Sequence, residues 1–334
     1  MKRSLIRTVI ATLWIGVACN LTIAQTPRPA ILTIDLQNYV EYQADIYDTS
    51  KFATDAGLTP SVPAKNFFAV TIIADIIAVN GQPARGTYIG RTRPIVASPA
   101  PAAGGAIADI TRTAMREHIF EIQKSDGTPV GTIMSSGFSG GPIPPGTGGP
   151  SGQKGNWAIT GGTGAFLGAR GQVAGTGGTS RAASMAEDPG YRRINGGTNN
   201  QFILHIIPMA QPQILSTAAG PAILHSSDFS PITAANPAVA GEALSVFATG
   251  LGPTNPDLDL SLPFPSKPLA AVNSPMSVTA NGTDAEILGA VGYPGAVNGY
   301  QVNFRLPPGM GKGLAAIQLT AAWIPSTPAS VAVQ

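Results

Sequence analysis

Apolar and polar positions alternate over short stretches along most of the chain, and Gly, Pro, Asn and Ser separate these stretches. Short runs of this kind that are rich in β-branched and aromatic residues predict strands. The pair Asn80-Gly81 is typical of a tight turn, and the triplet 125–127 favours a hairpin, although periodicity alone also allows a helix over 114–124. The strands predicted before residue 209 are 31–40, 67–79, 87–96, 114–124, 131–136, 156–160, 169–174 and 200–208.

Two Gly-rich excursions, 139–155 and 174–199, interrupt these strands, and a linker of mainly small residues covers 209–219. Short strands continue beyond the linker between Gly, Pro and Asn turns, which is typical of a small β-sandwich. We expect residues 215–334 to fold independently. The strands predicted there are 243–249, 277–280, 285–289, 300–306 and 314–322.

The segment 300–304 alternates as a half-buried strand should. Val302 and Phe304 are out of phase with Gln301 and Asn303, so the two pairs lie on opposite faces. The pattern predicts a core on the apolar face and hydrogen-bonded polar groups on the other. We assign Trp323 to the same core.

The composition supports a turn-rich β protein. Of 334 residues, 40 are Gly and 30 are Pro, and only 11% are charged. So many backbone breakers exclude a long helical protein, and so few charges with 43% apolar residues exclude a disordered tail. Glycine has no three-residue period, which excludes collagen. The length is consistent with about two domains.

The N-terminus has the pattern of a secretion signal. Three basic residues precede an uncharged apolar run over 8–18, and we predict a signal peptide over residues 1–24 with cleavage after Ala24. The alternative is lipoprotein processing at Cys19. Either route predicts a secreted, periplasmic or cell-surface protein, and no later segment predicts a transmembrane helix. The basic residues are Lys2, Arg3 and Arg7.

Removal of the signal changes the charge and the cysteine count. It leaves 17 Lys and Arg against 18 Asp and Glu, a net charge of −1, so the basic footprint of a nucleic-acid-binding protein is absent. Within this balance, segment 209–334 has a net charge of −3, from three basic and six acidic residues. Cys19 is the only cysteine, and its loss excludes disulfides, thiolate metal sites and cysteine nucleophiles.

The string from Gly161 to Gly168 superficially matches a dinucleotide-binding loop. Its third glycine falls one residue late for that motif, and the residues after it predict a strand rather than a helix. The flanking segments also lack the βαβ alternation that such a loop requires. Dinucleotide binding is therefore not predicted, and we expect no cofactor.

Three stretches, in the same order, resemble the signature of dirigent proteins and allene oxide cyclases. The resemblance covers about residues 30–208 and implies an eight-stranded antiparallel barrel, which we place at 25–208; barrels of this family often form trimers. Glycines allow positive φ at a hairpin, and Phe166 can close a barrel end, so we predict a structural role for the motif. The stretches are 88–92, 131–137, and 161–166 followed by 169–171; the motif residues are Gly161, Gly162, Thr163, Gly164, Phe166, Arg170 and Gly171.

The C-terminal part resembles a different family. Segments 244–253 and 295–307, with the turn Asn281-Gly282 between them, are similar to an Ig-like C-terminal module of secreted acidobacterial proteins. That module has no assigned activity. The resemblance implies an Ig-like β-sandwich over 220–334.

Charged residues near the predicted strands of the barrel are the only candidates for chemistry. If 114–124 is a strand, Arg116 and His118 share one face, and Glu117 lies on the other. Ionisable groups inside a barrel could bind a polar ligand or transfer protons, whereas cross-strand ion pairs or solvated faces are the structural alternative. The lumen candidates are Asp75, Arg91, Arg93, Arg116, Glu117 and His118.

No other chemistry stands out. The three histidines, His118, His205 and His225, are too scattered along the chain to predict a metal site. No serine has the spacing of a nucleophile elbow. We therefore expect a non-catalytic binding or scaffold protein of the bacterial cell envelope or exterior, whose partner is a small apolar ligand or an envelope or extracellular molecule. The alternatives are a barrel enzyme or ligand carrier that guides an isomerisation, cyclisation or coupling, and a carbohydrate-binding adhesin.

Overall fold

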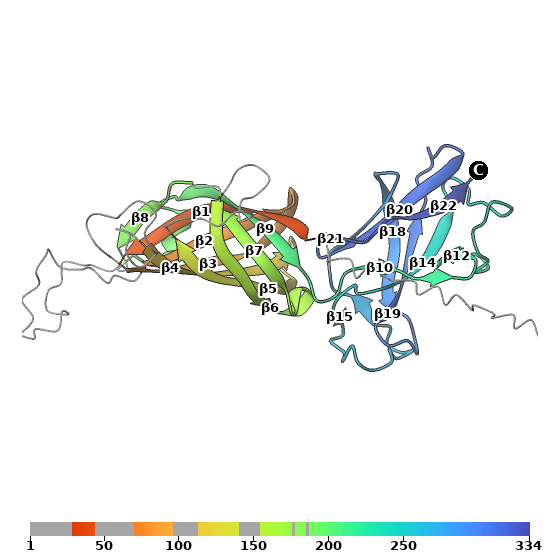
Figure 1. Ribbon diagram of the computed structural model, residues 1–334, viewed down its shortest axis with the longest axis horizontal. Helices are drawn as coiled ribbons and strands as arrows, with labels where there is room; N and C mark the ends of the chain where they lie inside the picture. The colour runs from red at the N-terminus through yellow and green to blue at the C-terminus, as the bar shows by residue number, and fades with distance from the viewer. Residues whose placement is uncertain (1–28, 44–69, 96–112, 140–153, 176–177, 185–186) are drawn as a thin grey trace, which may run out of the picture.

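The computed structural model describes residues 29–43, 70–95, 113–139, 154–175, 178–184 and 187–334 (Figure 1). Within these ranges every regular element is a β-strand or a short 3₁₀-helix, and the prediction of an all-β protein is confirmed. The predicted signal peptide, Cys19 and most of the excursion 139–155 lie outside the described residues.

Eight antiparallel strands of the first part close into a barrel (Figure 1). The pairing runs β2-β3-β4-β5-β6-β7-β9-β1, and β1 returns to pair with β2. A short ninth strand, β8, lies parallel to β1. The bounds are β1 Ala30–Gln43, β2 Val70–Val79, β3 Gln82–Ile95, β4 Thr113–Lys124, β5 Pro129–Ser139, β6 Lys154–Gly162, β7 Arg170–Gly175, β8 Arg181–Ser184 and β9 Thr198–Ile207.

Both predicted hairpins are present. Asn80 and Gly81 have φ of 50° and 74° and turn β2 into β3, as two left-handed residues do in a tight hairpin. Strands β4 and β5 pair in register on either side of the second turn, which settles the choice between helix and strand for 114–124. A bulge in β1 around Asn38, whose φ is 54°, reverses the alternation of that strand and turns Tyr39 inward.

The barrel core follows from the period of two along each strand. Every second side chain is buried, and these side chains fill the interior with β-branched and aromatic groups. Among the largest fully buried ones are Leu32, Ile34, Ile72, Tyr88, Phe120, Ile122, Phe166 and Leu204.

The glycine motif forms the turn between β6 and β7 at one end of the barrel. The 3₁₀-helix η3 (Gly164–Phe166) starts at a glycine with φ of 61°, and the Phe166 ring is fully buried in the barrel core. Gly171, on β7, has φ of 135°, and a Cβ there would lie 1.9 Å from the backbone oxygen of His205. Gly161 differs, because a Cβ on it would meet nothing within 4 Å.

This contrast gives a test within the motif. We expect Gly171→Ala to lower the free energy of unfolding by about 1–3 kcal/mol or more, since it adds both a strained φ and a backbone clash. Gly161→Ala is the matched control and should change it by less than about 0.5 kcal/mol. Urea unfolding followed by far-UV circular dichroism measures both, and equal losses would contradict the account.

Eleven strands of the second part form one curled sheet with its own core, and β11 and β12 pair only with each other. Its main path is β10-β14-β19-β18-β17-β20-β21, and β13, β15, β16 and β22 pair at its sides. Strands β10 and β11 fall within the segment predicted as a linker. The bounds are β10 Gln213–Ile214, β11 Ser216–Thr217, β12 Gly220–Pro221, β13 Ile223–His225, β14 Ala243–Thr249, β15 Thr254–Asn255, β16 Ala271–Val272, β17 Met276–Ala280, β18 Thr283–Gly292, β19 Gly299–Arg305, β20 Gly313–Ala321, β21 Ile324–Pro325 and β22 Ala329–Val333.

The turn between β20 and β21 enters the end of the barrel. Ala322 and Trp323 have φ of 49° and 61°, and together with Ile324 they are buried in the barrel core cluster. Asn273 Nδ2 also donates a hydrogen bond of 2.8 Å to the carbonyl oxygen of Pro129 across the junction. The assignment of Trp323 to the C-terminal core is therefore wrong, because this tight turn carries the indole out of its own sheet.

Candidate functional site

The two ends of the barrel differ in the side chains that fill them. Near the C-terminal part, Phe166 and Trp323 complete a core that is apolar except for the unpaired indole nitrogen of Trp323. At the opposite end, side chains that carry a polar nitrogen or oxygen atom point inward from four neighbouring strands. They are Thr92 on β3, Arg116 and His118 on β4, Ser135 on β5 and Trp157 on β6.

Strand register brings these five residues together. Thr92 lies opposite Arg116, and His118 lies opposite Ser135. Each residue has a buried nitrogen or oxygen atom with no hydrogen-bond partner on the protein, and such atoms are rare in folded proteins. The atoms are Thr92 Oγ1, Arg116 Nε, His118 Nε2, Ser135 Oγ and Trp157 Nε1. Most are donors, so the layer is suited to a molecule that brings acceptors.

Aromatic rings surround His118 and hold it rigidly. Its ring lies 4.8 Å from the centre of Trp157 and 5.4 Å from that of Phe202, edge to face in both cases. The Tyr88 hydroxyl and His118 Nδ1 share a hydrogen bond of 2.7 Å. Tyr39 stacks on Tyr88 at 5.8 Å, which extends the cluster toward the barrel end.

A hollow of about 180 Å³ opens directly in front of this cluster, and we call it the mouth pocket. The rings of Tyr39, Trp157 and Phe202 form its apolar walls, and Arg116 supplies a cation. The Arg116 guanidinium lies 5.9 Å from the Trp157 ring centre. The remaining lining residues are Glu41, Gly175, Gly178, Ser180 and Asn200.

The charges of the mouth pocket are not paired with each other. Within the part of the chain that the structure describes, no carboxylate lies within ion-pairing distance of Arg116. Glu41 instead accepts a hydrogen bond of 3.1 Å from the Ser180 hydroxyl. Arg116 is therefore the group in the pocket that most needs a partner.

Burial makes the central pair a poor proton relay. Desolvation, followed by the Arg116 charge, lowers the pKa of His118 to about 3. Desolvation also raises the pKa of Tyr88 well above its ordinary value, and it raises that of Tyr39. At neutral pH the imidazole and the phenols are thus uncharged, and general acid–base catalysis works best with a pKa near the working pH. The arrangement is suited to holding a molecule by hydrogen bonds and ring contacts.

Of the six lumen candidates, the structure brings Arg116 and His118 together on the inner face. Arg91, Arg93 and Glu117 lie exposed on the outer face, where Arg91 is opposite Glu117. Arg116 and His118 therefore share a face as expected, but the arginines of β3 point outward because Tyr88 and Thr92 occupy its inner face.

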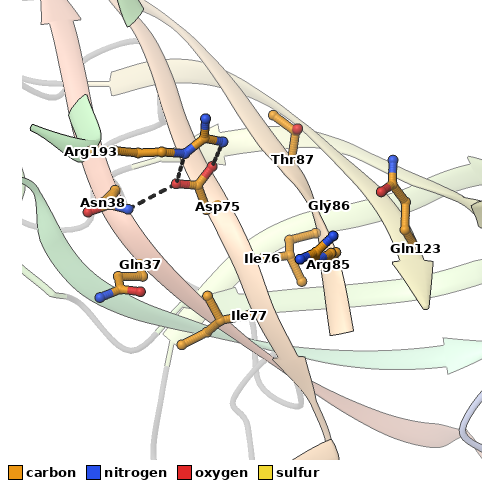
Figure 2. A pocket seen from close by; sticks show the side chains of 10 residues that line it. All are labelled: Gln37, Asn38, Asp75, Ile76, Ile77, Arg85, Gly86, Thr87, Gln123 and Arg193. Atoms are coloured by element: carbon orange, nitrogen blue, oxygen red, sulfur yellow. Dashed lines mark hydrogen bonds and ion pairs between the residues drawn. The ribbon is translucent and has the colours of Figure 1, made fainter. Parts of the chain in front are cut away.

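Asp75 also lies outside the lumen, beside a shallow hollow of about 500 Å³ (Figure 2). Its carboxylate accepts hydrogen bonds from Asn38 Nδ2 at 2.9 Å and from Arg193 Nη2 at 2.7 Å, and it pairs with the buried Arg192. This cluster fastens η4 (Pro189–Arg193) to the barrel wall, as a structural ion pair does.

Sequence patterns did not indicate five residues of the site, which are Thr92, Ser135, Tyr88, Tyr39 and Trp157. Each is one inward position in an ordinary strand, and only the pairing of the strands, with barrel closure for Tyr39 on β1, brings them close together. The signal that could have found Thr92 and Ser135 is a polar residue in phase with buried apolar ones. Among the described residues there is no group of three or more potential metal ligands, and no helix is long and apolar enough to span a membrane.

Comparison with known proteins identifies no relative. No family model matches the chain, and no curated protein or solved structure is significantly similar to it. The class that fold and site define is an all-β protein with a closed eight-stranded barrel and a polar pocket at one barrel end.

Proposed function

We propose that the chain is a non-catalytic binding protein that takes up a small molecule in the mouth pocket. The observation that carries this proposal is that two residues lining the pocket, Arg116 and Trp157, each have a buried nitrogen atom that lacks a protein partner. The pocket of about 180 Å³ is matched to a single ring, since a cavity of roughly 150 Å³ accommodates benzene.

The electrostatics favour binding over catalysis. A histidine with a pKa of about 3 is a weak base, and a phenol with a raised pKa is a weak acid. The hydrogen bond between Tyr88 and His118 is the one contact that favours the second candidate, an isomerase- or cyclase-like enzyme. That candidate predicts turnover of a small molecule by the purified protein and loss of turnover in Arg116→Ala.

We extend the proposal to family and location. The eight antiparallel strands and the position of the glycine motif at a barrel turn support a dirigent-like barrel, with trimers as its expected assembly. The alternation on β19 and the separate C-terminal core support an Ig-like sandwich. The N-terminal pattern supports a location in the cell envelope or outside the cell.

A thermal-shift screen of the full chain tests the binding function. The probes are ring-sized compounds that carry carboxylate, carbonyl or hydroxyl groups. A ligand that binds only the folded state stabilises it by about 2.7 kcal/mol at 100 times its Kd, which raises the midpoint by several degrees. We expect at least one compound to do so with the wild type and to lose its effect with Arg116→Gln.

Arg91→Gln is the matched control, because Arg91 is an exposed arginine on the neighbouring strand. It should respond to every active compound as the wild type does. A screen without any stabilising compound, or equal responses of Arg116→Gln and Arg91→Gln, would contradict a binding site at this end of the barrel.

A further inference from the structure

A second surface with the chemistry of a binding site lies on the C-terminal sheet, away from the barrel lumen. Strands β14, β19 and β18 are neighbours there (Figure 1). Their apolar face, with Val246 and Val302, is fully buried in the C-terminal core. The opposite face carries Phe247 on β14, with Gln301 directly across from it on β19.

Three aromatic rings meet on this outer face. Phe247 lies between Phe229 and Tyr293, with ring centres 6.5 Å and 5.3 Å away. Phe229 is 51% exposed and Tyr293 is 45% exposed. The planes of Phe247 and Tyr293 meet at 82°, so the rings form an open corner. We call the three rings the aromatic corner.

The backbone holds Phe229 outward in a costly conformation. Its φ is 56°, a left-handed value that a bulky residue adopts only when its surroundings impose it. The Asp228 carboxylate accepts a hydrogen bond of 2.9 Å from the Ser230 amide, and the Phe229 amide donates one of 2.9 Å to the His225 carbonyl. These contacts fix a strained turn whose effect is to present an aromatic ring to solvent rather than to bury it.

Amide groups beside the corner are oriented by a hydrogen-bond ladder. Ser245 Oγ and Gln301 Nε2 each donate a bond of 2.9 Å to Asn303 Oδ1. Both lone-pair directions of that oxygen are then used, and within the described chain Asn303 Nδ2 and Gln301 Oε1 have no partner. The face therefore offers fixed donors and a fixed acceptor next to aromatic rings.

The strand next to Asn303 has no side chain at the position opposite it. Gly289 lies opposite Asn303 on β18, and a Cβ on it would meet nothing within 4 Å. A molecule can therefore approach the free Asn303 amide along this strand. Arg305 and Glu286, which lie opposite each other on β19 and β18, already form an ion pair of 3.0 Å.

We propose that the aromatic corner, together with Gln301 and Asn303, binds a neutral carbohydrate chain. A pyranose ring presents C–H groups on its face, which stack on aromatic rings, and hydroxyls at its edge, which both donate to and accept from amides. Segment 209–334 has a net charge of −3, which disfavours phosphorylated or sulfated polymers. The strained Phe229 and the oriented amides distinguish this face from a merely apolar patch.

Affinity electrophoresis tests this assignment. The full chain is run on native gels that contain laminarin, soluble starch, xylan or hydroxyethylcellulose, and on a gel without polysaccharide. We expect at least one polysaccharide to retard the wild type. Phe247→Ala and Tyr293→Ala should each weaken that binding roughly tenfold or more, as loss of a stacked ring implies.

Tyr191→Ala is the matched control, since Tyr191 is a 54% exposed aromatic residue on the barrel. It should be retarded as strongly as the wild type. Tyr293→Ala removes a 45% exposed ring that is not part of the C-terminal core, so the test does not depend on the folding of Phe247→Ala. The proposal is overturned if none of the four polysaccharides retards the wild type. It is also overturned if both corner variants keep full retardation, or if Phe247→Ala instead turns an oligomer into a monomer in size-exclusion chromatography with light scattering.

Discussion

Trp323→Ala is expected to lower the free energy of unfolding by about 3–5 kcal/mol, the range for loss of a large buried aromatic side chain. The Trp323 side chain is 5% exposed and packs in the barrel core, although it belongs to the C-terminal part of the chain. Its removal would leave a cavity at the end of the barrel and break the apolar contact that joins the two cores. The loss should therefore appear in the unfolding of the barrel itself.

Urea unfolding of the full chain, followed by circular dichroism, measures this effect. Leu314→Ala is the matched control, since Leu314 lies on the adjoining strand β20 but is 74% exposed. That substitution should change the free energy of unfolding by less than about 0.5 kcal/mol. If Trp323→Ala were no more destabilising than Leu314→Ala, Trp323 would not be packed in the barrel core in solution.

The same contact bears on the expectation that residues 215–334 fold independently. The isolated segment would carry Trp323 on an exposed turn without the barrel that buries it. The residues of the C-terminal core, such as Val246 and Phe304, nevertheless lie within the segment, with the exception of Ile214. A folded fragment with a solvent-exposed tryptophan is the result that both observations predict, and the emission maximum of its fluorescence would show it.

Asp75→Asn is expected to lower the free energy of unfolding at neutral pH by about 3–5 kcal/mol, as removal of one partner from a buried ion pair does. The substitution keeps the size of the side chain but removes its charge. Arg192, whose side chain is 8% exposed, would then be buried without a counter-charge. Arg193 would lose a bidentate partner as well.

The pH dependence of this difference gives a second readout. Burial raises the pKa of Asp75, but the hydrogen bonds from Arg193, Asn38 and Arg192 outweigh it, so the pKa lies below its ordinary value of 3.8. A carboxyl group with a lowered pKa stabilises the fold above its unfolded-state pKa, and this stabilisation is lost as the pH falls through the folded-state value. The difference in free energy of unfolding between the wild type and Asp75→Asn should therefore become smaller below about pH 4.

Glu187→Gln is the control for this prediction. Glu187 pairs with Arg181 at 2.7 Å, but both side chains are partly exposed, so its removal should change the free energy of unfolding by less than about 1 kcal/mol. Urea titrations at pH 7 and pH 3 would compare the three proteins. If the difference in free energy of unfolding between the wild type and Asp75→Asn were the same at both pH values, Asp75 would stabilise the fold through its shape rather than its charge.

Apolar periodicity, β-branched and aromatic content and turn residues together predicted the eight strands of the barrel, because one face of each strand is buried. It also placed Arg116 and His118 on a common face. Periodicity does not show which of the two faces of a strand points into the barrel. When both faces carry polar residues, the sequence leaves the inner face undecided. On β3 the large Tyr88 ring occupies the interior, and Arg91 is therefore on the outside.

The rest of the site depends on contacts between distant residues. Tyr39 faces the mouth pocket only because a bulge at Asn38 reverses the alternation of β1, and a bulge has no clear sequence signal here. Trp323 reaches the barrel through a turn whose residues have left-handed backbone angles without being glycines. No local pattern predicts such a turn.

The central claim is that the barrel binds a small molecule at the end that contains Arg116 and Trp157. The most direct test is a ¹H–¹⁵N spectrum of the full chain, in which each indole N–H gives its own signal. Trp157 lies at the mouth pocket and Trp323 at the opposite end of the barrel, so the protein contains its own control, and Trp157→Phe assigns the first signal. We expect a stabilising compound to shift the Trp157 indole signal and to leave that of Trp323 in place. Unchanged Trp157 signals at saturating compound, or shifts confined to Trp323, would contradict the claim.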